Sequence, residues 1–410
     1  MNKIREGYKM TELGEIPSEW AISKIGELTE IKTGGTPSTK CEKYWKDGDI
    51  PWMASGDVNK KIINEVDGRI TKSGMENSAA KLLPKDTVMI ALNGQGKTKG
   101  TVAYLNIELT CNQSLAGFLP SYNVFNSKYL YYNLQSRYFE IRGLAGDGAR
   151  NGLNLGLLRE ILIPIPSIKE QEKIASILST VDEQIDNVDA LIEKNKELKK
   201  GLMQTLLTKG IGHTKFKKTE IGEIPEEWDV KKLECVFEIL DSMRKPIKAS
   251  DREKIEGNIP YYGASGVIDW INDYIFDEEL ILLGEDGENL NSRNSDLAFK
   301  ISGKTWVNNH AHVFRVINKK ECNIDFMVYY LEAKDYSIYI AGSAQPKITQ
   351  AQCRKFLLPL PEKQEQDKIA SILLESDKKI EEYENKKQKL EELKKGLMQE
   401  LLTGMIRVTV

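Results

Sequence analysis

The sequence predicts an α+β chain built by tandem duplication. It has two α/β domains in tandem, separated by two long antiparallel helices that form an intramolecular coiled coil with a pseudo-twofold relation. Two repeats indicate this. Residues 163–211 and 358–406 align without a gap at an offset of 195, and TELGEIPSEW at 11–20 returns almost unchanged at 219–228. Because both repeats occur in the same order, each copy is a domain followed by a helix.

The repeat that begins at residue 163 predicts the helices. Each copy opens with two prolines, which favour an extended entry, and then runs for more than forty residues without another proline. Apolar residues recur at alternating steps of four and three, the spacing of a coiled-coil seam, with a break at Asn195 and weak positions at Ser376 and Lys387. The residues expected to pack between the helices are Ile174, Leu178, Val181, Ile185, Val188, Ile192, Leu198, Leu202, Leu206, Ile369, Leu373, Ile380, Tyr383, Leu390, Leu393, Leu397 and Leu401.

Connectivity predicts that the helices run antiparallel within one chain. The first helix leads into the second domain, and the second helix begins where that domain ends. Acidic residues crowd the first half of the first helix and lysines crowd its end, and the second helix repeats this polarity, so antiparallel packing places opposite charges side by side. A coil that joins two separate chains is the alternative.

These patterns divide the chain into a first α/β domain at 1–166, a first long helix at 167–209, a second α/β domain at 210–361 and a second long helix at 362–410. Short apolar runs between glycine-rich turns predict strands, and longer periodic runs predict one closing helix in each domain. The expected strands are 87–92, 101–105, 280–283, 305–307 and 312–316, and the expected helices are 127–142 and 325–333.

Hydrophobic runs, cysteine content and charge limit the classes of protein to which this chain can belong. No apolar run approaches the length of a membrane span and the polar start does not resemble a signal peptide, so we expect a cytoplasmic protein. Five scattered cysteines predict reduced thiols. Residues 1–166 hold 21 basic and 18 acidic side chains, and residues 210–361 hold 20 and 24. DNA binding would therefore depend on local patches or on partners.

The sequence contains no clear catalytic motif. Residues 91–98 (ALNGQGKT) resemble a phosphate-binding loop, but a strand-like segment follows where such a loop requires a helix. His310 and His312 lie on one face of a predicted strand without a third ligand nearby, so we expect no metal site. We therefore expect a protein that is not itself an enzyme and that has no cofactor of its own.

Several loops of the first domain have side chains suited to DNA. The segment IKTGGTPS suggests a flexible turn whose backbone N–H groups approach phosphates, and the glycine-rich loop at 143–154 presents groups able to pair with base edges. The candidate contacts of this domain are Lys32, Thr33, Gly34, Gly35, Thr36, Asn93, Gln95, Lys97, Lys99, Arg150, Asn151 and Asn154.

The second domain has different chemistry at the corresponding places, which two unlike half-sites would require and which unselected loop drift would also produce. Its candidate contacts are Arg244, Lys245, Asn289, Asn291, Arg293, Gln345 and Lys347. The pairing of the two copies also aligns Cys111-Asn112-Gln113 with Asn308-Asn309-His310.

Taken together, the motifs resemble the specificity (S) subunit of type I restriction-modification systems, the HsdS family. The resemblance covers essentially the full chain and rests on GEIPxxW, on TGGTPS with the downstream Tyr44-Trp45 and Ile50-Pro51-Trp52, and on the helix starts and endings of both copies. It implies two target recognition domains, each for one half of a split site in double-stranded DNA, with the helices setting the spacer. The second domain departs from the pattern, because DSMRKP stands at 241–246 in place of TGGTP.

The resemblance also implies partners. These are two modification (methyltransferase) subunits, which bind S-adenosylmethionine and methylate adenine, and restriction subunits that translocate and cut, with ATP and Mg required only in the partners. Two alternatives remain. A regulatory protein with the same two-domain body would not associate with a modification subunit, and an autonomous nuclease would cleave DNA alone with a divalent metal.

Overall fold

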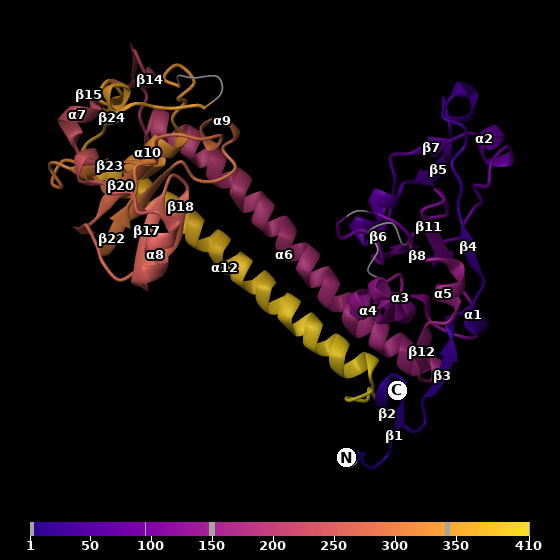
Figure 1. Cartoon of the computed structure of the whole chain (residues 1–410). Coiled ribbons are helices and arrows are strands. Elements are labelled where there is room, and N and C mark those ends of the chain that lie inside the picture. Colours follow the sequence, from indigo (N-terminus) through magenta and orange to yellow (C-terminus); the bar gives the residue numbers. More distant parts are fainter. Residues whose placement is uncertain (1–3, 95, 147–151, 341–344, 410) are drawn as a thin grey trace. The chain divides into compact units, whose positions relative to one another are not determined.

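The computed structural model describes residues 4–94, 96–146, 152–340 and 345–409. Internal contacts divide the chain into two units, residues 1–188 with 386–410 and residues 189–385. Two long helices, α6 (Ile168–Lys209) and α12 (Lys363–Leu402), each contribute to both units (Figure 1). Each unit therefore contains one α/β domain, the start of one long helix and the end of the other.

The domain of the first unit is built on a five-stranded sheet. Neighbouring strands are antiparallel except β9 and β6, which are parallel. In sheet order the strands are β4 (Ile31–Thr33), β11 (Leu115–Phe118), β8 (Val88–Ala91), β9 (Val102–Leu105) and β6 (Ile62–Ile63).

The central strand β8 is buried on both faces, which explains its unbroken apolar sequence. Val88 and Ile90 face the core formed with α3 (Ser127–Ser136) and the long helices, whereas Met89 and Ala91 face a second, smaller core. The strand therefore joins the two cores of the domain.

Smaller elements complete the first unit. They are the hairpin β1 (Tyr8–Thr11) and β2 (Gly14–Pro17), the pair β3 (Ala21–Lys24) and β12 (Leu162–Ile165), the sheet β10 (Thr110–Cys111), β5 (Ile50–Met53) and β7 (Arg69–Ile70), and the helices α1 (Ile25–Leu28), η1 (Glu42–Tyr44), η2 (Ser55–Lys60), α2 (Lys72–Glu76), α4 (Tyr138–Gly143) and α5 (Leu155–Arg159).

The second unit repeats this plan with two four-stranded sheets. One sheet has the order β16 (Phe237–Ile239), β23 (Ala311–Val316), β20 (Leu280–Gly284) and β21 (Ala298–Ile301), and the other has the order β18 (Gly266–Ile271), β17 (Glu256–Gly263), β22 (Lys304–Val307) and β19 (Phe276–Asp277). Strand β20 is fully buried, and its alternate residues enter two cores as those of β8 do.

The remaining elements of the second unit include strand pairs equivalent to those of the first. They are β13 (Phe216–Thr219) with β14 (Gly222–Pro225), β15 (Asp229–Lys232) with β24 (Leu357–Leu360), and the helices α7 (Leu233–Val236), η3 (Asp241–Met243), α8 (Ala249–Arg252), η4 (Glu253–Ile255), α9 (Asn289–Ser292), α10 (Ile324–Ala333) and α11 (Gln350–Cys353). Strands expected from the sequence at 280–283, 305–307 and 312–316 are confirmed by β20, β22 and β23.

The expected closing helices are also present, with one difference. Residues 127–142 form two helices, α3 and α4, because the backbone leaves the helical conformation at Arg137. The Arg137 guanidinium donates to the Leu162 carbonyl at 2.5 Å and pairs with Glu140 one turn later. The Arg137 side chain therefore joins the end of α3 to strand β12.

A buried glutamine at the start of each long helix ties the helix to its domain. In the first unit the Gln171 amide donates to the Pro166 carbonyl at 3.0 Å and accepts from the Asn126 N–H, the cap of α3, at 2.8 Å. Gln366 makes the equivalent bonds to Pro361 and Asn323, both at 2.8 Å. A buried polar group requires such partners, which explains why Glu-Gln follows the prolines in both copies.

The glutamate before each glutamine binds the tryptophan of the GEIPxxW motif. The Trp20 indole N–H donates to the Glu170 carboxylate at 3.1 Å, and Trp228 donates to Glu365 at 2.9 Å. Both indoles are 1% exposed, so the two motifs that recur in the sequence are partners in one buried contact in each unit.

The long helices pack start against end in each unit, as expected for an antiparallel pair. In the first unit Ile174 and Leu178 near the start of α6 share a core with Leu401 near the end of α12. In the second unit Ile369 near the start of α12 shares a core with Leu206 near the end of α6. Figure 1 shows the two helices running alongside each other.

The expected seam needs one correction in each helix. Leu198 is 56% exposed and Leu393 is 51% exposed, so neither lies on the seam. The alternation of four and three continues instead through Asn195 and Lys199 in α6 and through the equivalent Lys394 in α12. The expectation failed because polar residues occupy these seam positions. Lys199 and Lys394 form ion pairs with Asp377 and Asp182, and the Asn195 amide donates to the Leu191 carbonyl.

The other expected seam residues are buried or half-buried. They are Ile174, Leu178, Val181, Ile185, Val188, Ile192, Leu202, Leu206, Ile369, Leu373, Ile380, Tyr383, Leu390, Leu397 and Leu401. Among the residues that the structure describes, no helix combines the length and apolar character needed to cross a bilayer.

Candidate nucleic-acid interface

Two of the loops expected to contact DNA lie side by side in the first domain. The Leu153 N–H donates to the Leu92 carbonyl at 2.9 Å. Gly152 approaches Asn93 so closely that a Cβ at this glycine would lie 1.9 Å from the Asn93 Oδ1. The turn after β8 and the segment before α5 therefore form one surface, on which the Asn93 side chain is exposed.

Helix α4 supports the same turn from its other side. The Tyr138 hydroxyl donates to the Lys97 carbonyl at 2.8 Å, and the Arg142 guanidinium donates to the Lys99 carbonyl at 3.0 Å. The Lys97 side chain is exposed and that of Lys99 is half-buried. Main-chain carbonyls accept both bonds. The bonds therefore hold the turn without using the amino group of Lys97.

Three of the expected contacts, Gln95, Arg150 and Asn151, lie outside the described residues. Asn154 is described and has a structural role, because its side-chain oxygen accepts from the Leu157 N–H at 3.0 Å and caps α5. Thr349 caps α11 in the same way in the second domain.

The glycines of the TGGTP motif serve packing, which differs from the expected flexible turn. A Cβ at Gly34 would lie 1.9 Å from the Cys111 carbonyl oxygen, and one at Gly35 would lie 2.5 Å from the Ala79 carbonyl carbon. The Gly35 N–H already donates to Cys111 at 2.8 Å. These glycines are buried because two other backbone segments approach them, so the Gly35 N–H is not available to a phosphate.

The tryptophans downstream of this motif hold its backbone. The Trp52 indole N–H donates to the Gly35 carbonyl at 3.0 Å, and that of Trp45 donates to the Ser38 carbonyl at 3.1 Å. This explains why the motif and the two tryptophans occur together. Thr36 remains on the surface and its hydroxyl donates to the exposed Gln113 at 2.5 Å.

Gln113 was not among the expected contacts, although it lies in a segment shared by the two copies. The side chains of Lys32 and Thr33, the two remaining candidate contacts in the IKTGGTPS segment, are less accessible. Lys32 lies 3.3 Å from the Glu30 carboxylate, and Thr33 is half-buried in β4.

The second domain brings the corresponding loops together through corresponding bonds. The Ile348 N–H donates to the Glu285 carbonyl at 2.8 Å, as Leu153 does to Leu92. The Gly287 N–H also donates to the Pro346 carbonyl at 3.1 Å. Glu285 and its neighbour Asp286 thus replace Leu92 and Asn93 at the surface formed by the two loops.

The structure shifts one part of the expected alignment by a residue. The Asn112 side chain accepts from the Ser114 N–H at 3.0 Å, and the Asn308 side chain accepts from the His310 N–H at 2.8 Å. Asn112 therefore corresponds to Asn308 and not to Asn309. On this alignment His310 replaces Ser114.

A charged cluster lies beneath the loops of the second domain, formed by Asp241, Arg244, Glu285, His312 and Lys347. The Arg244 guanidinium donates to Glu285 at 2.6 Å and to the Ala311 carbonyl at 2.6 Å, and its side chain is 12% exposed. Lys347 lies 2.9 Å from the other oxygen of Glu285. Arg244 was expected to contact DNA, but the structure assigns its donors to the interior of the domain.

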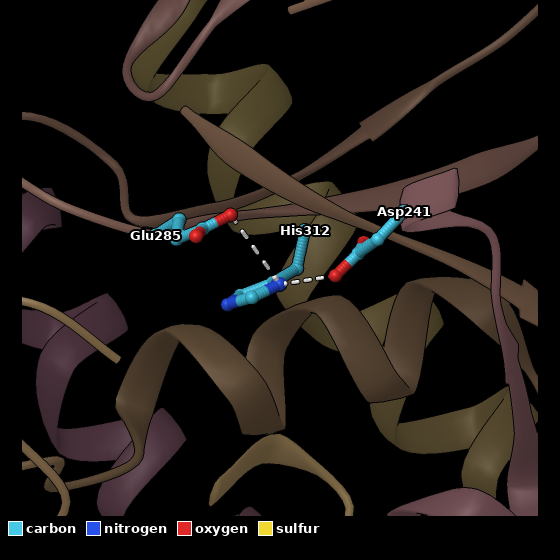
Figure 2. Close-up of side chains that lie close together, drawn as sticks. All are labelled: Asp241, Glu285 and His312. Atoms are coloured by element: carbon cyan, nitrogen blue, oxygen red, sulfur yellow. Dashed lines mark hydrogen bonds and ion pairs between the residues drawn. The ribbon is translucent and has the colours of Figure 1, made fainter. Parts of the chain in front are cut away.

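His312 is the centre of this cluster, and Figure 2 shows its ring between the Asp241 and Glu285 carboxylates. Its Nδ1 lies 2.7 Å from the Asp241 carboxylate, and its Nε2 lies 2.9 Å from the Ile348 carbonyl. Both partners are acceptors, so both ring nitrogens carry a proton. Burial lowers the pKa of His312, but the bonds to Asp241 and Cys353 outweigh burial and raise this pKa to about 10.

The same contacts argue against a metal at this place, although ligand atoms of Asp241, Glu285 and His312 lie within 4.8 Å of one another. A metal requires an unprotonated ring nitrogen, and both nitrogens of His312 are donors here. Arg244 and Lys347 already neutralise Glu285. The cluster is therefore an internal ion-pair network.

The remaining expected contacts of the second domain divide into structural and exposed residues. Asn289 binds both the N–H and the carbonyl of Ser295, and Arg293 donates to the Lys334 carbonyl at 2.6 Å. These side chains shape the loop around α9. The exposed residues are Lys245, Asn291, Gln345 and Lys347.

A family model described as the type I restriction modification DNA specificity domain matches residues 17–199 and again residues 225–392. The MjaIX type I restriction enzyme specificity subunit of Methanocaldococcus jannaschii is 26% identical over 432 residues, covering 98% of this chain and 96% of that protein. The putative MjaX type I restriction enzyme specificity subunit of the same organism is 29% identical over 427 residues, covering 98% and 97%.

Solved structures share the fold. The S subunit of a type I restriction-modification system from M. genitalium has a TM-score of 0.61 at 19% identity, with 97% of both chains covered. A chain from a structure on complex assembly and conformational transition of the type I R-M system has a TM-score of 0.58 at 15% identity, covering 95% of this chain and 99% of that one.

Proposed function

Because the chain belongs to the family of type I restriction-modification DNA specificity domains, we propose that each of its α/β domains recognises one half of a bipartite DNA site. The observation that carries this proposal is the pair of equivalent loop surfaces. Leu92–Asn93 meets Leu153 in the first domain, and Glu285–Asp286 meets Ile348 in the second, through the same backbone bond.

The side chains on these two surfaces differ while the backbone bonds agree. Asn93 in the first domain corresponds to Asp286 in the second, and Ser114 corresponds to His310. Amide, carboxylate, hydroxyl and imidazole groups pair with different base edges in the major groove. Two domains with a shared frame and unlike surfaces suit a site with two unlike halves.

Charge supports dependence on partners for tight binding. Neither domain is strongly basic, and the residues of the second sum to a net negative charge. Since phosphate contacts supply much of the affinity of DNA-binding proteins, the isolated chain is expected to bind DNA weakly at physiological salt and to gain affinity in a complex.

The repeat places an exposed leucine at the same motif position of each long helix, and this pair forms the proposed docking surface. Leu198 is 56% exposed and Leu393 is 51% exposed, and they occupy equivalent positions within the LKKGLMQ motif. Isolated exposed leucines are ordinary, but two equivalent leucines in a repeated motif suit two copies of one partner. We assign them to two modification subunits, which carry S-adenosylmethionine and the methylation chemistry.

Restriction subunits, which require ATP and Mg, join the same complex in this proposal. The chain itself supplies recognition and not catalysis. The paired helices set the number of base pairs between the half-sites.

Co-expression with a type I modification subunit tests the proposal. Methylation mapped in a host without other adenine methyltransferases is expected at one bipartite motif. Exchanging residues 40–150 for those of a related subunit is expected to alter one half of the motif only. Changes in both halves, or methylation independent of this chain, would contradict it.

A matched pair of variants tests the docking surface. The double variant Leu198→Lys with Leu393→Lys is expected to lose co-purification with the modification subunit. The control is Leu191→Lys, which alters a leucine on α6 that is 38% exposed and has lysine at the equivalent position of α12. If the wild type, the double variant and the control retain the modification subunit equally, Leu198 and Leu393 do not belong to the interface.

A further inference from the structure

An open groove lies beside the candidate DNA surface of the second domain. Its volume is about 460 Å³, within the range of ligand-binding cavities. One wall is formed by the turn between β17 and β18 and by Val267 and Ile268 of β18, and the other wall holds Asp286, Asn308 and His310. The groove therefore combines an aliphatic wall with a wall that carries a carboxylate and an imidazole.

Asp286 is held firmly on this wall. The His310 Nδ1 lies 2.9 Å and 3.1 Å from its two carboxylate oxygens. The backbone of Asp286 pairs with Lys347 in an isolated antiparallel bridge, which continues the contact between the two loops. The side chains of Asp286 and His310 are 29% and 51% exposed, so both reach the solvent in the groove.

Hydrogen bonds of the buried Asn308 hold the backbone at His310 in place. The His310 N–H donates to the Asn308 side chain, which is only 5% exposed, and the Asn308 N–H donates to the Tyr262 carbonyl at 3.0 Å. These contacts determine where the imidazole lies. His310 in turn determines where the carboxylate of Asp286 lies.

We propose that Asp286, positioned by His310, recognises the exocyclic amino group of a cytosine in the second half-site. This inference rests on the proposed function, which it deepens by naming a base-recognition residue. A carboxylate beside DNA is repelled by phosphates and is favourable only where it accepts from a donor. In the major groove cytosine presents the N4 donor, whereas guanine presents two acceptors and thymine an acceptor with a methyl group. Adenine also presents a donor, N6, but beside the N7 acceptor, which repels a carboxylate and suits an amide instead.

The surroundings of Asp286 favour this role over repulsion from the duplex. Lys347 lies 2.9 Å from the neighbouring Glu285, so a cation stands next to the carboxylates of this loop. Val267 and Ile268 are 44% and 54% exposed, and they offer apolar contact to adjacent base edges such as a thymine methyl group. The first domain has Asn93 at the equivalent place, and an amide suits adenine instead.

Selection from a randomised duplex library tests this, with the full-length chain bound to its modification subunit. The wild type is expected to select cytosine at one position of the second half-site. Asp286→Asn preserves size and the bond to His310 and is expected to reduce the preference for cytosine about 5- to 150-fold, with adenine gaining. The first half-site is expected to remain unchanged.

Glu288→Gln is the matched control. Glu288 is exposed on the same loop outside the groove, so this change removes the same charge without altering the recognition surface. Both variants are expected to bind DNA that lacks the recognised site more tightly than the wild type, because each removes one negative charge, and only Asp286→Asn is expected to change a base preference.

His310→Ala tests the positioning role. It is expected to weaken the preference at the same position, and the double variant Asp286→Asn with His310→Ala is expected to lose no more than Asp286→Asn alone. A wild-type bipartite profile that Asp286→Asn leaves unchanged would overturn the inference while the proposed function stands. A wild-type profile without two half-sites would overturn both.

Discussion

Lys394, near the end of α12, forms an ion pair with Asp182 in the first half of α6, with 2.6 Å between Nζ and Oδ1. The Tyr132 hydroxyl donates to the other oxygen of Asp182 at 2.8 Å. Each of the three residues belongs to a different helix, so the pair connects α3 of the domain to both long helices.

The same three residue types recur in the second unit. Lys199 pairs with Asp377, and the Tyr329 hydroxyl donates to Asp377 at 2.5 Å. In each unit the lysine comes from the long helix of the other copy. The repeat thus specifies helix pairing through two equivalent polar contacts at seam positions.

We expect Lys394→Met to destabilise the pairing of the helices, because it leaves Asp182 without its cation on a partly buried surface. A double-mutant cycle with Asp182→Asn is expected to give a coupling free energy of about 0.5–3 kcal/mol in urea unfolding. Lys395→Met, which changes an exposed lysine on the same turn, is the control. A coupling of zero would mean that the ion pair does not specify the pairing.

Asp241→Ala is expected to destabilise the second domain by about 3–5 kcal/mol, because it leaves the buried imidazolium of His312 without its counter-ion. The equivalent residue of the first domain is Thr33, and Thr33→Ala serves as the matched control with a smaller expected loss. Hydrogen exchange of the peptides that cover β23 measures the effect in the full chain. Unchanged protection of β23 would contradict the ion-pair network.

Stability of the second domain is expected to fall as pH rises from about 6.5 towards 10. The folded pKa of His312, about 10, exceeds the ordinary value of 6.5, so its contribution is complete below pH 6.5 and is lost through pH 10. Glu285 also faces this ring. Burial raises the pKa of Glu285, but the bonds from Arg244 and Lys347 outweigh burial and lower it, so this carboxylate stays charged in the interval. Burial raises the pKa of Cys353, which adds a loss in the same direction above pH 9.

Urea midpoints of the wild type and of His312→Gln between pH 6 and pH 9 provide the measurement. The wild type is expected to lose stability across this interval, and His312→Gln is expected to show a flatter profile from a lower starting value. Parallel profiles would show that His312 titrates alike in the folded and unfolded chains.

The helix pair is expected to act as the spacer of the bipartite site. Adding one heptad between Val188 and Asn195 and another between Tyr383 and Leu390 preserves the seam and lengthens each helix by roughly 10 Å. This length corresponds to about three base pairs, which also rotate the duplex by about 100°. We expect a preferred spacer about one to three base pairs longer, with unchanged half-sites.

Mapping the methylated sites of the lengthened protein measures the spacer. Insertion of three residues in place of seven is the control, because it shifts the phase of the seam and is expected to prevent assembly. An unaltered spacer in an active complex would assign the spacing to the partner subunits.

Much of the architecture was predictable because its signals are local or repeated. The two gapless repeats, the heptad seam and the buried strands β8 and β20 all follow from patterns in adjacent residues. The motifs around Glu170-Gln171 and Glu365-Gln366 were visible as repeats as well. Their physical role was not visible, since the Asn126 and Trp20 partners of Gln171 and Glu170 lie more than forty residues away.

The sequence by itself therefore determined the duplication, the fold class and the family resemblance, because periodicity and repetition are properties of the chain alone. Tertiary structure decided which polar groups remain available to a ligand. Arg244 is internal because Glu285 and the Ala311 carbonyl take its donors, and Gly34 and Gly35 are buried because Cys111 and Ala79 approach them. Asp286 and His310 meet only when two distant strands pair, because a side chain's availability depends on which long-range contacts have already satisfied it.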